Sequence, residues 1–96
     1  MRLTKNFYRK EARDRDCQVR LPLHCNFDSD TTVLAHKNGG GMGMKALDIH
    51  GAWCCSSCHD VIDNRVKTEL EREDVILSFY EAIFRTQEIL IREDKL

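Results

Sequence analysis

The feature that most constrains this chain is a group of closely spaced cysteines, in the segment Trp53-Cys54-Cys55-Ser56-Ser57-Cys58-His59-Asp60. Cys55 and Cys58 form a Cys-x-x-Cys pair, a spacing at which two thiolates can reach one metal ion. The chain has 96 residues and 5 cysteines. A domain this small buries little apolar surface, and a bound metal ion is one way in which such domains gain stability. The segment therefore predicts a metal-stapled fold.

The composition favours metal ligation over disulfide bonding. Residues 1–16 are rich in Arg, Lys and Asp, and they contain no apolar run of the kind that a signal peptide or a membrane span requires. We therefore expect a cytoplasmic protein with no membrane partner, in which thiols stay reduced. The odd number of cysteines, 5, argues in the same direction.

A second pair of cysteines, Cys17 and Cys25, flanks Pro22. The proline interrupts the segment, so we expect a strand end followed by a turn rather than a long strand. Such a turn can bring both sulfurs together, and with Cys55 and Cys58 they would complete a tetrahedral zinc site of four cysteines. Four thiolates leave no open position for water, so the predicted zinc ion is structural.

The fifth cysteine leaves one alternative open. Cys54 is expected to be a small buried apolar side chain. In the competing assignment Cys54 replaces Cys55 as a ligand, although its spacing to Cys58 is less typical. His24 is a further candidate ligand beside Cys25, and we expect it to be exposed instead.

The remaining pattern predicts a small α+β fold in one domain, residues 1–96. Residues 32–36 are β-branched and apolar and read as a strand, with residues 51–54 as its antiparallel partner. Residues 55–66 then change to helical spacing, with Ser56 or Ser57 as the cap and Val66 on the apolar face.

A long C-terminal helix is predicted over residues 70–92, after a short N-terminal helix around residues 8–13. Apolar side chains recur along the long helix at helical spacing, and we interpret them as core packing. They are Val75, Ile76, Phe79, Ala82, Ile83, Ile89 and Leu90.

Charge is distributed unevenly along the chain. Residues 1–20 carry seven Lys or Arg against three acids, a net charge of +4, whereas residues 67–96 carry five against eight, a net charge of −3. The basic half could follow a phosphate backbone, with the acidic end facing away from it. The predicted nucleic-acid contacts are Arg9, Lys10, Arg13, Arg15, Lys37 and Lys45.

Residues 37–45 contain four glycines, so no regular element is expected there and the bare backbone could approach a phosphate. The segment lacks the Gly-Lys-Ser/Thr ending of a nucleotide-binding P-loop, which excludes that class of site. His36 ends the preceding strand and could point into a cleft. A half-buried structural histidine is the other interpretation of that position.

The order strand, His36, glycine loop, Asp48, strand and Cys-x-x-Cys-His resembles the HNH (His-Me finger, ββα-metal) endonucleases. More closely, Cys-Gln-Val-Arg, Val-Leu-Ala-His, Gly-Met-Gly-Met-Lys and Cys-Ser-Ser-Cys-His-Asp are similar to small HNH-type nucleases encoded by lambdoid phages and prophages. The resemblance covers about residues 9–66. It implies a basic arm in residues 1–16, a zinc-stapled ββα-metal core in residues 17–66 and a helical scaffold in residues 67–96.

The resemblance also implies catalytic roles. His36 matches the general base that takes a proton from the attacking water, and His59 matches the ligand of a catalytic divalent ion such as Mg²⁺, Mn²⁺, Ni²⁺ or Zn²⁺. Asp48 falls near the central Asn of the family and would orient His36 or join His59 on the metal.

One position departs from the family pattern. Many HNH enzymes have a metal-binding Asp immediately before the base, and this chain has Ala35 there. The catalytic ion would then depend on His59 together with Asp48, His50 or Asp63.

The sequence therefore predicts a metal-dependent DNA endonuclease. The alternative is a zinc-stabilised DNA-binding module without catalysis, and a weaker one is a zinc knuckle that binds only protein. A homodimer is plausible for a nuclease that cuts two strands, although no motif in the sequence supports one.

Overall fold

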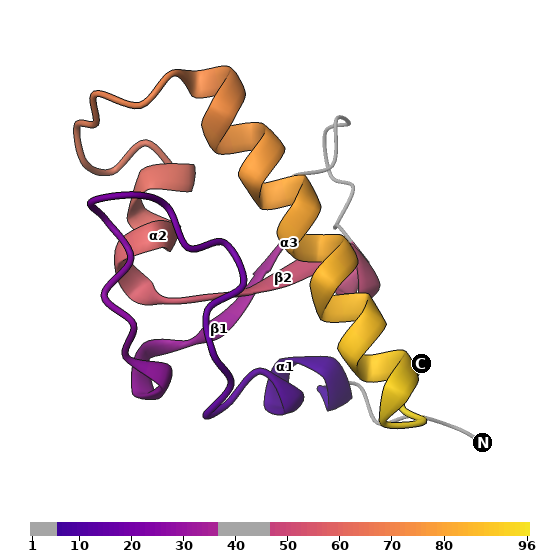
Figure 1. Ribbon diagram of the computed structural model, residues 1–96. Helices are drawn as coiled ribbons and strands as arrows, with labels where there is room; N and C mark the ends of the chain where they lie inside the picture. The colour runs from indigo at the N-terminus through magenta and orange to yellow at the C-terminus, as the bar shows by residue number, and fades with distance from the viewer. Residues whose placement is uncertain (1–5, 37–46) are drawn as a thin grey trace.

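The structure is a computed structural model, which describes residues 6–36 and 47–96. A two-stranded antiparallel hairpin lies at its centre, with helices packed around it (Figure 1). This arrangement confirms the predicted small α+β fold with a long C-terminal helix. In chain order the elements are α1 (Phe7–Glu11), the 3-10 turn η1 (Ser29–Thr31), β1 (Val33–His36), the 3-10 turn η2 (Asp48–His50), β2 (Gly51–Cys54), α2 (Ser56–Ile62) and α3 (Arg72–Arg92).

Both predicted strands are present, and they pair antiparallel as expected. Leu34 lies opposite Trp53, and Ala35 lies opposite Ala52. All four residues of β2 are buried, because the strand is covered on both faces. Ala52 and Cys54 pack into the larger core together with the other cysteines, whereas Trp53 packs on the opposite side with Ala12 and Leu90.

The hairpin requires glycine at its end next to η2. Gly51 pairs with His36, and a Cβ atom on Gly51 would lie 2.7 Å from Cδ1 and 2.8 Å from Cγ of Leu34. The same Cβ would lie 3.1 Å from the carbonyl oxygen of Ala35. Because Leu34 occupies the space of the missing side chain, the bare backbone of Gly51 lets the two strands meet beside His36.

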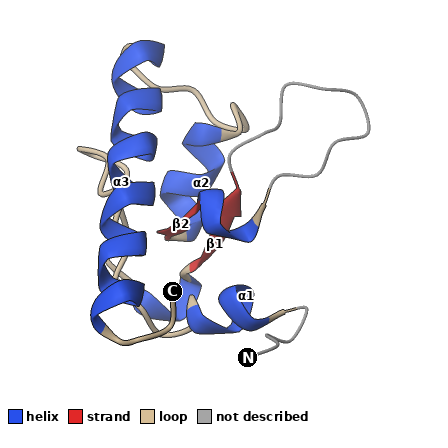
Figure 2. Cartoon of the chain, turned by 90° about the vertical axis from the view of Figure 1, so that its right-hand side faces the viewer, coloured by secondary structure: helices blue, strands red, loops and turns tan. Residues whose placement is uncertain are grey.

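α3 supplies the wall against which the hairpin packs. Figure 2 shows it as a column along one side of the molecule, with α2 and the hairpin beside it. The predicted core stripe is largely correct, but Ile76 is 39% exposed and Thr86 is buried in addition. The buried residues of α3 are Val75, Phe79, Ala82, Ile83, Thr86 and Leu90. No helix among the described residues has the length and apolar character needed to cross a membrane.

The free edge of β2 is closed by hydrogen bonds from neighbouring segments. The buried backbone N–H of Trp53 donates to Oγ1 of Thr86 at 3.1 Å, and the N–H of Gln18 donates to the Trp53 carbonyl at 2.8 Å. Arg85 of α3 donates to the carbonyl of Gln18 at 2.6 Å. An open strand edge would present unpaired backbone groups, so these bonds fix both α3 and the segment around Cys17 and Gln18 onto the sheet.

The basic start and the acidic end of the described chain lie together, which corrects the expectation that the acidic end faces away. Arg15 bonds both carboxylate oxygens of Glu93 at 2.6 Å and also reaches Glu11 at 3.0 Å. Its guanidinium lies 4.5 Å from the ring centre of Trp53. Arg15 lowers the pKa of the Glu93 carboxyl to about 2, and Lys95 also contributes. The charges of the two ends therefore partly neutralise each other.

Three local predictions were wrong in detail. Residues 17–25 contain no strand, and Pro22 begins a turn over residues 22–24. α2 ends at Ile62, four residues earlier than predicted, because Asn64 adopts a left-handed φ of 59° and Val66 is exposed. The cap of α2 is Cys55 rather than a serine, and its sulfur accepts the N–H of Cys58 at 3.4 Å.

The contact at Gly51 predicts a specific loss of stability. Gly51→Ala should lower the free energy of unfolding by about 1–3 kcal/mol, because the added methyl group overlaps Leu34. Denaturant unfolding of Gly51→Ala, Leu34→Ala and the double variant measures this effect. In the Leu34→Ala background the Gly51→Ala change should cost much less. An equal cost in both backgrounds would contradict the overlap.

Candidate functional site

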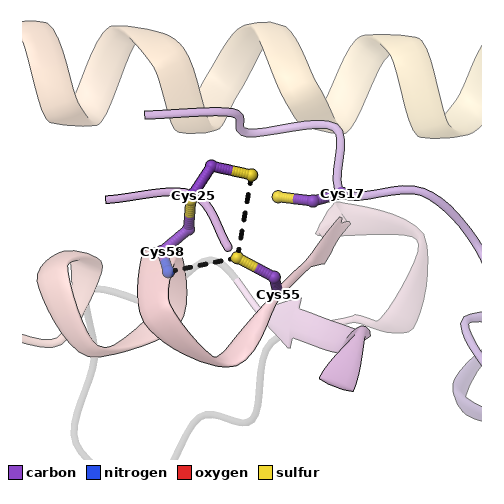
Figure 3. A group of neighbouring side chains, drawn as sticks. All are labelled: Cys17, Cys25, Cys55 and Cys58. Atoms are coloured by element: carbon purple, nitrogen blue, oxygen red, sulfur yellow. Dashed lines mark hydrogen bonds between the residues drawn. The ribbon is translucent and has the colours of Figure 1, made fainter. Parts of the chain in front are cut away.

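Four cysteine sulfurs gather at one point beside the start of α2. The Sγ atoms of Cys17, Cys25, Cys55 and Cys58 all lie within 4.8 Å of one another, and Figure 3 shows them directed toward a common centre. Sulfurs bound at 2.3 Å around a tetrahedral zinc ion would lie about 3.8 Å apart. The Sγ atoms of Cys25 and Cys55 are 3.9 Å apart. The cluster therefore has the dimensions of a four-thiolate site that could hold a metal ion such as zinc.

Backbone amides point at these sulfurs from the surrounding loops. The N–H of Arg20 donates to Cys17 Sγ at 3.5 Å, and the N–H of Leu21 donates to Cys58 Sγ at 3.4 Å. Arg20 has a left-handed φ of 50°, a conformation that costs about 1–2 kcal/mol for a residue with a side chain. Amide donors of this kind favour thiolate over thiol, so the loop is shaped for charged sulfurs.

The four thiols would not all be ionised without a bound cation. Burial raises the pKa of the Cys25 thiol to about 11. The pKa of Cys17 is lowered, because the thiols of Cys54 and Cys58 donate hydrogen bonds to its sulfur. Four negative charges cannot share so small a volume unless a cation compensates them, and a bound dication deprotonates coordinating thiols outright.

Cys54 stands apart from the four clustered cysteines. It is fully buried, and its thiol lies 3.4 Å from the carbonyl oxygen of Cys55. The pKa of the Cys54 thiol is raised, mainly because this thiol is hydrogen-bonded to Cys17. The structure thus groups Cys55, not Cys54, with the other three sulfurs, and Cys54 is the predicted buried apolar residue. His24 is also outside the cluster, and its Nε2 lies 2.8 Å from Oγ1 of Thr68.

A second constellation forms where the two strands meet the 3-10 turn η2. Nε2 of His36, at the end of β1, lies 2.6 Å from Oδ1 of Asp48, the first residue of η2. Nε of Arg9 in α1 lies 3.5 Å from the same carboxylate oxygen. The hairpin thus brings a histidine and an acid together that are twelve positions apart in the chain.

His36 borders a hollow of about 160 Å³ between β1, α2 and α3. Ile62 of α2 and Arg72 of α3 also line this hollow. The guanidinium of Arg72 donates to the carbonyls of Val61 at 3.3 Å and of Ile62 at 2.8 Å, so it ties the end of α2 to the start of α3. No local pattern marks Arg72 in the sequence, because its role depends on how the two helices pack.

His59 lies on α2, one helical turn before Ile62 and on the same face. Its Nε2 is 3.2 Å from Oδ2 of Asp63, which in turn pairs with Arg65 at 3.3 Å. His50 does not line the His36 hollow and borders a separate groove on α3. Within residues 6–36 and 47–96, the four cysteines are the one group of three or more metal-ligating side chains with converging donor atoms. A shared metal ion on His59 and Asp48 therefore remains a prediction.

The predicted nucleic-acid contacts divide into three groups. Arg9, Lys10 and Arg13 are exposed on or just after α1. Arg15 is already held by Glu11 and Glu93, so a phosphate would have to compete with two carboxylates for it. Lys37, Lys45 and the glycine-rich loop between them lie outside the described residues.

The chain is similar in sequence and in structure to known proteins. Residues 6–95 match the model of a family described as "Putative nuclease YbcO". The chain is 41% identical over 91 residues to the putative nuclease YbcO of Escherichia coli strain K12, a match that spans 88% of this chain and 91% of that protein. The putative nuclease ybcO of Enterobacteria phage 82 gives the same values. A solved structure of a putative bacteriophage protein from Escherichia coli K-12 MG1655 superposes with a TM-score of 0.80 at 38% identity, and the match covers 92% of this chain and 100% of that one.

Adjacent cysteines offer a matched test of the metal site. We expect purified protein to contain one zinc ion per chain, Cys55→Ala to lose it and Cys54→Ala to keep it, because only Cys55 joins the other three sulfurs. Elemental analysis of the three purified proteins gives the zinc content. Loss of zinc from Cys54→Ala together with retention in Cys55→Ala would show that the ligand assignment is wrong.

Proposed function

This chain belongs to the YbcO family of putative nucleases, and on that premise we propose that it is a metal-dependent DNA endonuclease of the HNH type. The observation that carries the proposal is the His36–Asp48 pair, 2.6 Å apart at the edge of the hollow between β1, α2 and α3. A histidine held by a carboxylate in a partly exposed hollow is an arrangement suited to general-base catalysis.

The hydrogen bond to Asp48 decides which nitrogen of His36 is free to act. An ionised carboxylate only accepts hydrogen bonds, so the Nε2 nitrogen of His36 carries the proton and Nδ1 keeps its lone pair. In the proposed reaction Nδ1 takes a proton from water, and the resulting hydroxide attacks phosphorus. The bond to the 3′ oxygen breaks, and the leaving oxygen takes a proton from solvent water. Asp48 stabilises the imidazolium that forms. Nε of Arg9 lies 3.5 Å from the same carboxylate oxygen of Asp48 and would help to hold that side chain in place.

His59 is the proposed ligand of the catalytic divalent ion. The imidazole of His59 and the carboxylate of Asp63 lie on one face of α2, and this donor pair suits Mn²⁺, Ni²⁺ or Zn²⁺, with Mg²⁺ favouring the carboxylate. A divalent ion bound there would neutralise charge on the phosphate and on the leaving oxygen. Asp48 is a further proposed ligand.

The fold offers a physical reason why Ala35 stands where many HNH enzymes have a metal-binding Asp. Ala35 is 1% exposed and packs in the larger core, opposite in direction to its neighbour His36. An aspartate at that position would bury a charge beside the cysteine cluster. We infer that the metal shell in this chain is completed from α2 or η2 rather than from β1.

The four-cysteine cluster is proposed to hold a structural zinc ion. It joins the segment after α1 to the start of α2, so it would fix the helix that carries His59. DNA is the proposed substrate, with exposed Arg9, Lys10 and Arg13 as phosphate contacts and Lys37 and Lys45 as further candidates.

The absence of a carboxylate at Ala35 also favours a second candidate, a zinc-stabilised DNA-binding module without catalysis. That module would bind DNA with a strong dependence on salt, but it would form no products with Mg²⁺, Mn²⁺, Ni²⁺ or Zn²⁺. Product formation by the wild-type chain separates the two candidates.

The first functional prediction concerns the general base. His36→Ala should slow plasmid nicking by about 10²–10⁴-fold with zinc content unchanged, because the attacking water loses its proton acceptor. His24→Ala is the control, since His24 bonds Thr68 and lies outside the His36 hollow. Nicking at the wild-type rate by His36→Ala would exclude His36 as the base.

The second functional prediction concerns the hydrogen bond that orients the base. Asp48→Asn keeps the shape of the side chain but removes the negative charge, so it should lower the nicking rate on the order of 10²-fold or more while DNA affinity changes little. Single-turnover cleavage and fluorescence anisotropy on the same protein measure the two quantities. A variant that binds DNA weakly but cleaves at the wild-type rate would contradict the role proposed for Asp48.

A further inference from the structure

One side of α3 presents apolar side chains away from the core. Leu77, Tyr80, Phe84 and Ile91 are 56%, 40%, 63% and 55% exposed. They are separated by three, four and seven residues, which places them in one line along the helix. Gln87 lies between Phe84 and Ile91, and when it is included the five positions alternate in steps of three and four residues, as the a and d positions of a coiled-coil heptad do. We call these four apolar residues the exposed stripe.

A groove of about 530 Å³ lies beside the exposed stripe. Leu77, Tyr80 and Phe84 line it from α3, and His50 lines it from η2. Contiguous apolar surface of this kind on a small protein commonly marks an interaction site. In a helix–helix contact the side chains of one helix fit into a groove on the other. The exposed stripe supplies such side chains, and the neighbouring groove supplies the space.

We propose that the exposed stripe is the contact surface of an antiparallel homodimer. The stripe is symmetrical about Phe84, because Leu77 lies seven residues before it and Ile91 lies seven residues after it. A half-turn about an axis through Phe84 places Leu77 of one copy against Ile91 of the other. The same rotation places Tyr80 near Gln87 and the two Phe84 rings at the centre. The stripe is therefore complementary to itself, as a two-fold interface must be.

The charges on α3 favour the antiparallel direction. Residues 72–83 carry one Arg against three acids, a net charge of −2, whereas residues 85–92 carry two Arg against one Glu, a net charge of +1. Antiparallel pairing sets these unlike halves against each other, and parallel pairing would set like halves together. In the register centred on Phe84, Asp74 comes within about one helical turn of Arg92, and Glu81 within about one turn of Arg85.

The size of the surface fits a reversible dimer. Large side chains exposed to this extent contribute on the order of 100 Å² each, so the four residues of the stripe would bury about 800 Å² over both copies. An area of that size is typical of weak, transient interfaces, and we expect a dissociation constant on the order of 10 µM.

The proposed dimer does not depend on the proposed nuclease function. If the chain is a nuclease, however, dimerisation would decide how its two His36 hollows are placed. Tyr80 borders both the groove and the His36 hollow. In the antiparallel arrangement the two Tyr80 positions would lie about 12 Å apart along the helix axis. The two His36 hollows would then open beside one shared interface.

Sedimentation equilibrium of the full-length chain, over about 1–200 µM, tests the proposal. Phe84→Glu should raise the dissociation constant by about tenfold or more, because it places a charge at the centre of the contact. Phe27→Glu is the matched control, since Phe27 is 80% exposed on the loop after Cys25 and should leave the constant unchanged. Leu77→Glu is the second variant at the stripe, and circular dichroism checks that each variant folds.

Charge reversal tests the direction of the helices. Asp74→Arg and Arg92→Glu should each weaken the dimer, and the double variant should recover most of the loss, because the unlike charges again face each other. Failure of the double variant to recover would overturn the antiparallel register. A chain that stays monomeric over the whole range, or a dimer indifferent to both Phe84→Glu and Leu77→Glu, would overturn the dimer itself.

Discussion

The convergence of four cysteine sulfurs is the constraint on which the rest of this structure depends. The sulfurs come from the loop after α1, from the turn after Pro22 and from the start of α2, and all lie within 4.8 Å of one another. Residues 17–25 have no regular secondary structure, so beyond the hydrogen bonds of Gln18 and the buried side chains of Val19 and Leu21 it is the cluster that joins them to α2. A cation at the centre would balance the thiolates and hold the loop and the helix together. The position of α2, which carries His59, would then depend on this cation.

The fold was predictable wherever a local pattern dictated the structure. Both strands, their antiparallel pairing and the long C-terminal helix followed from apolar periodicity and β-branched composition. The four-cysteine cluster followed from the Cys-x-x-Cys spacing and from the turn at Pro22. Each of these features was indicated by a short local pattern, although the two cysteine pairs and the two strands that come together lie far apart in the chain.

The errors arose where distant segments decide the outcome. The serines beside Cys55 are better helix caps by propensity, but the sulfur of Cys55 takes that role because the cluster already fixes it there. The charge pattern suggested separate basic and acidic ends, yet Arg15 bonds Glu93 from seventy-eight positions away. The roles given to His36, Asp48 and His59 rest on resemblance and remain proposals, although the structure does bring His36 and Asp48 together.

The hydrogen bonds of α3 have a consequence for how the chain folds during its synthesis on the ribosome. Thr86 accepts a hydrogen bond from the edge of β2, Arg85 bonds Gln18 directly after Cys17, and Arg72 bonds the end of α2. A ribosome releases the hairpin and all five cysteines before it releases α3. The nascent chain therefore carries an open strand edge and unsupported thiols until α3 emerges. The hairpin and the cysteine cluster would reach their final packing only after α3 has been synthesised.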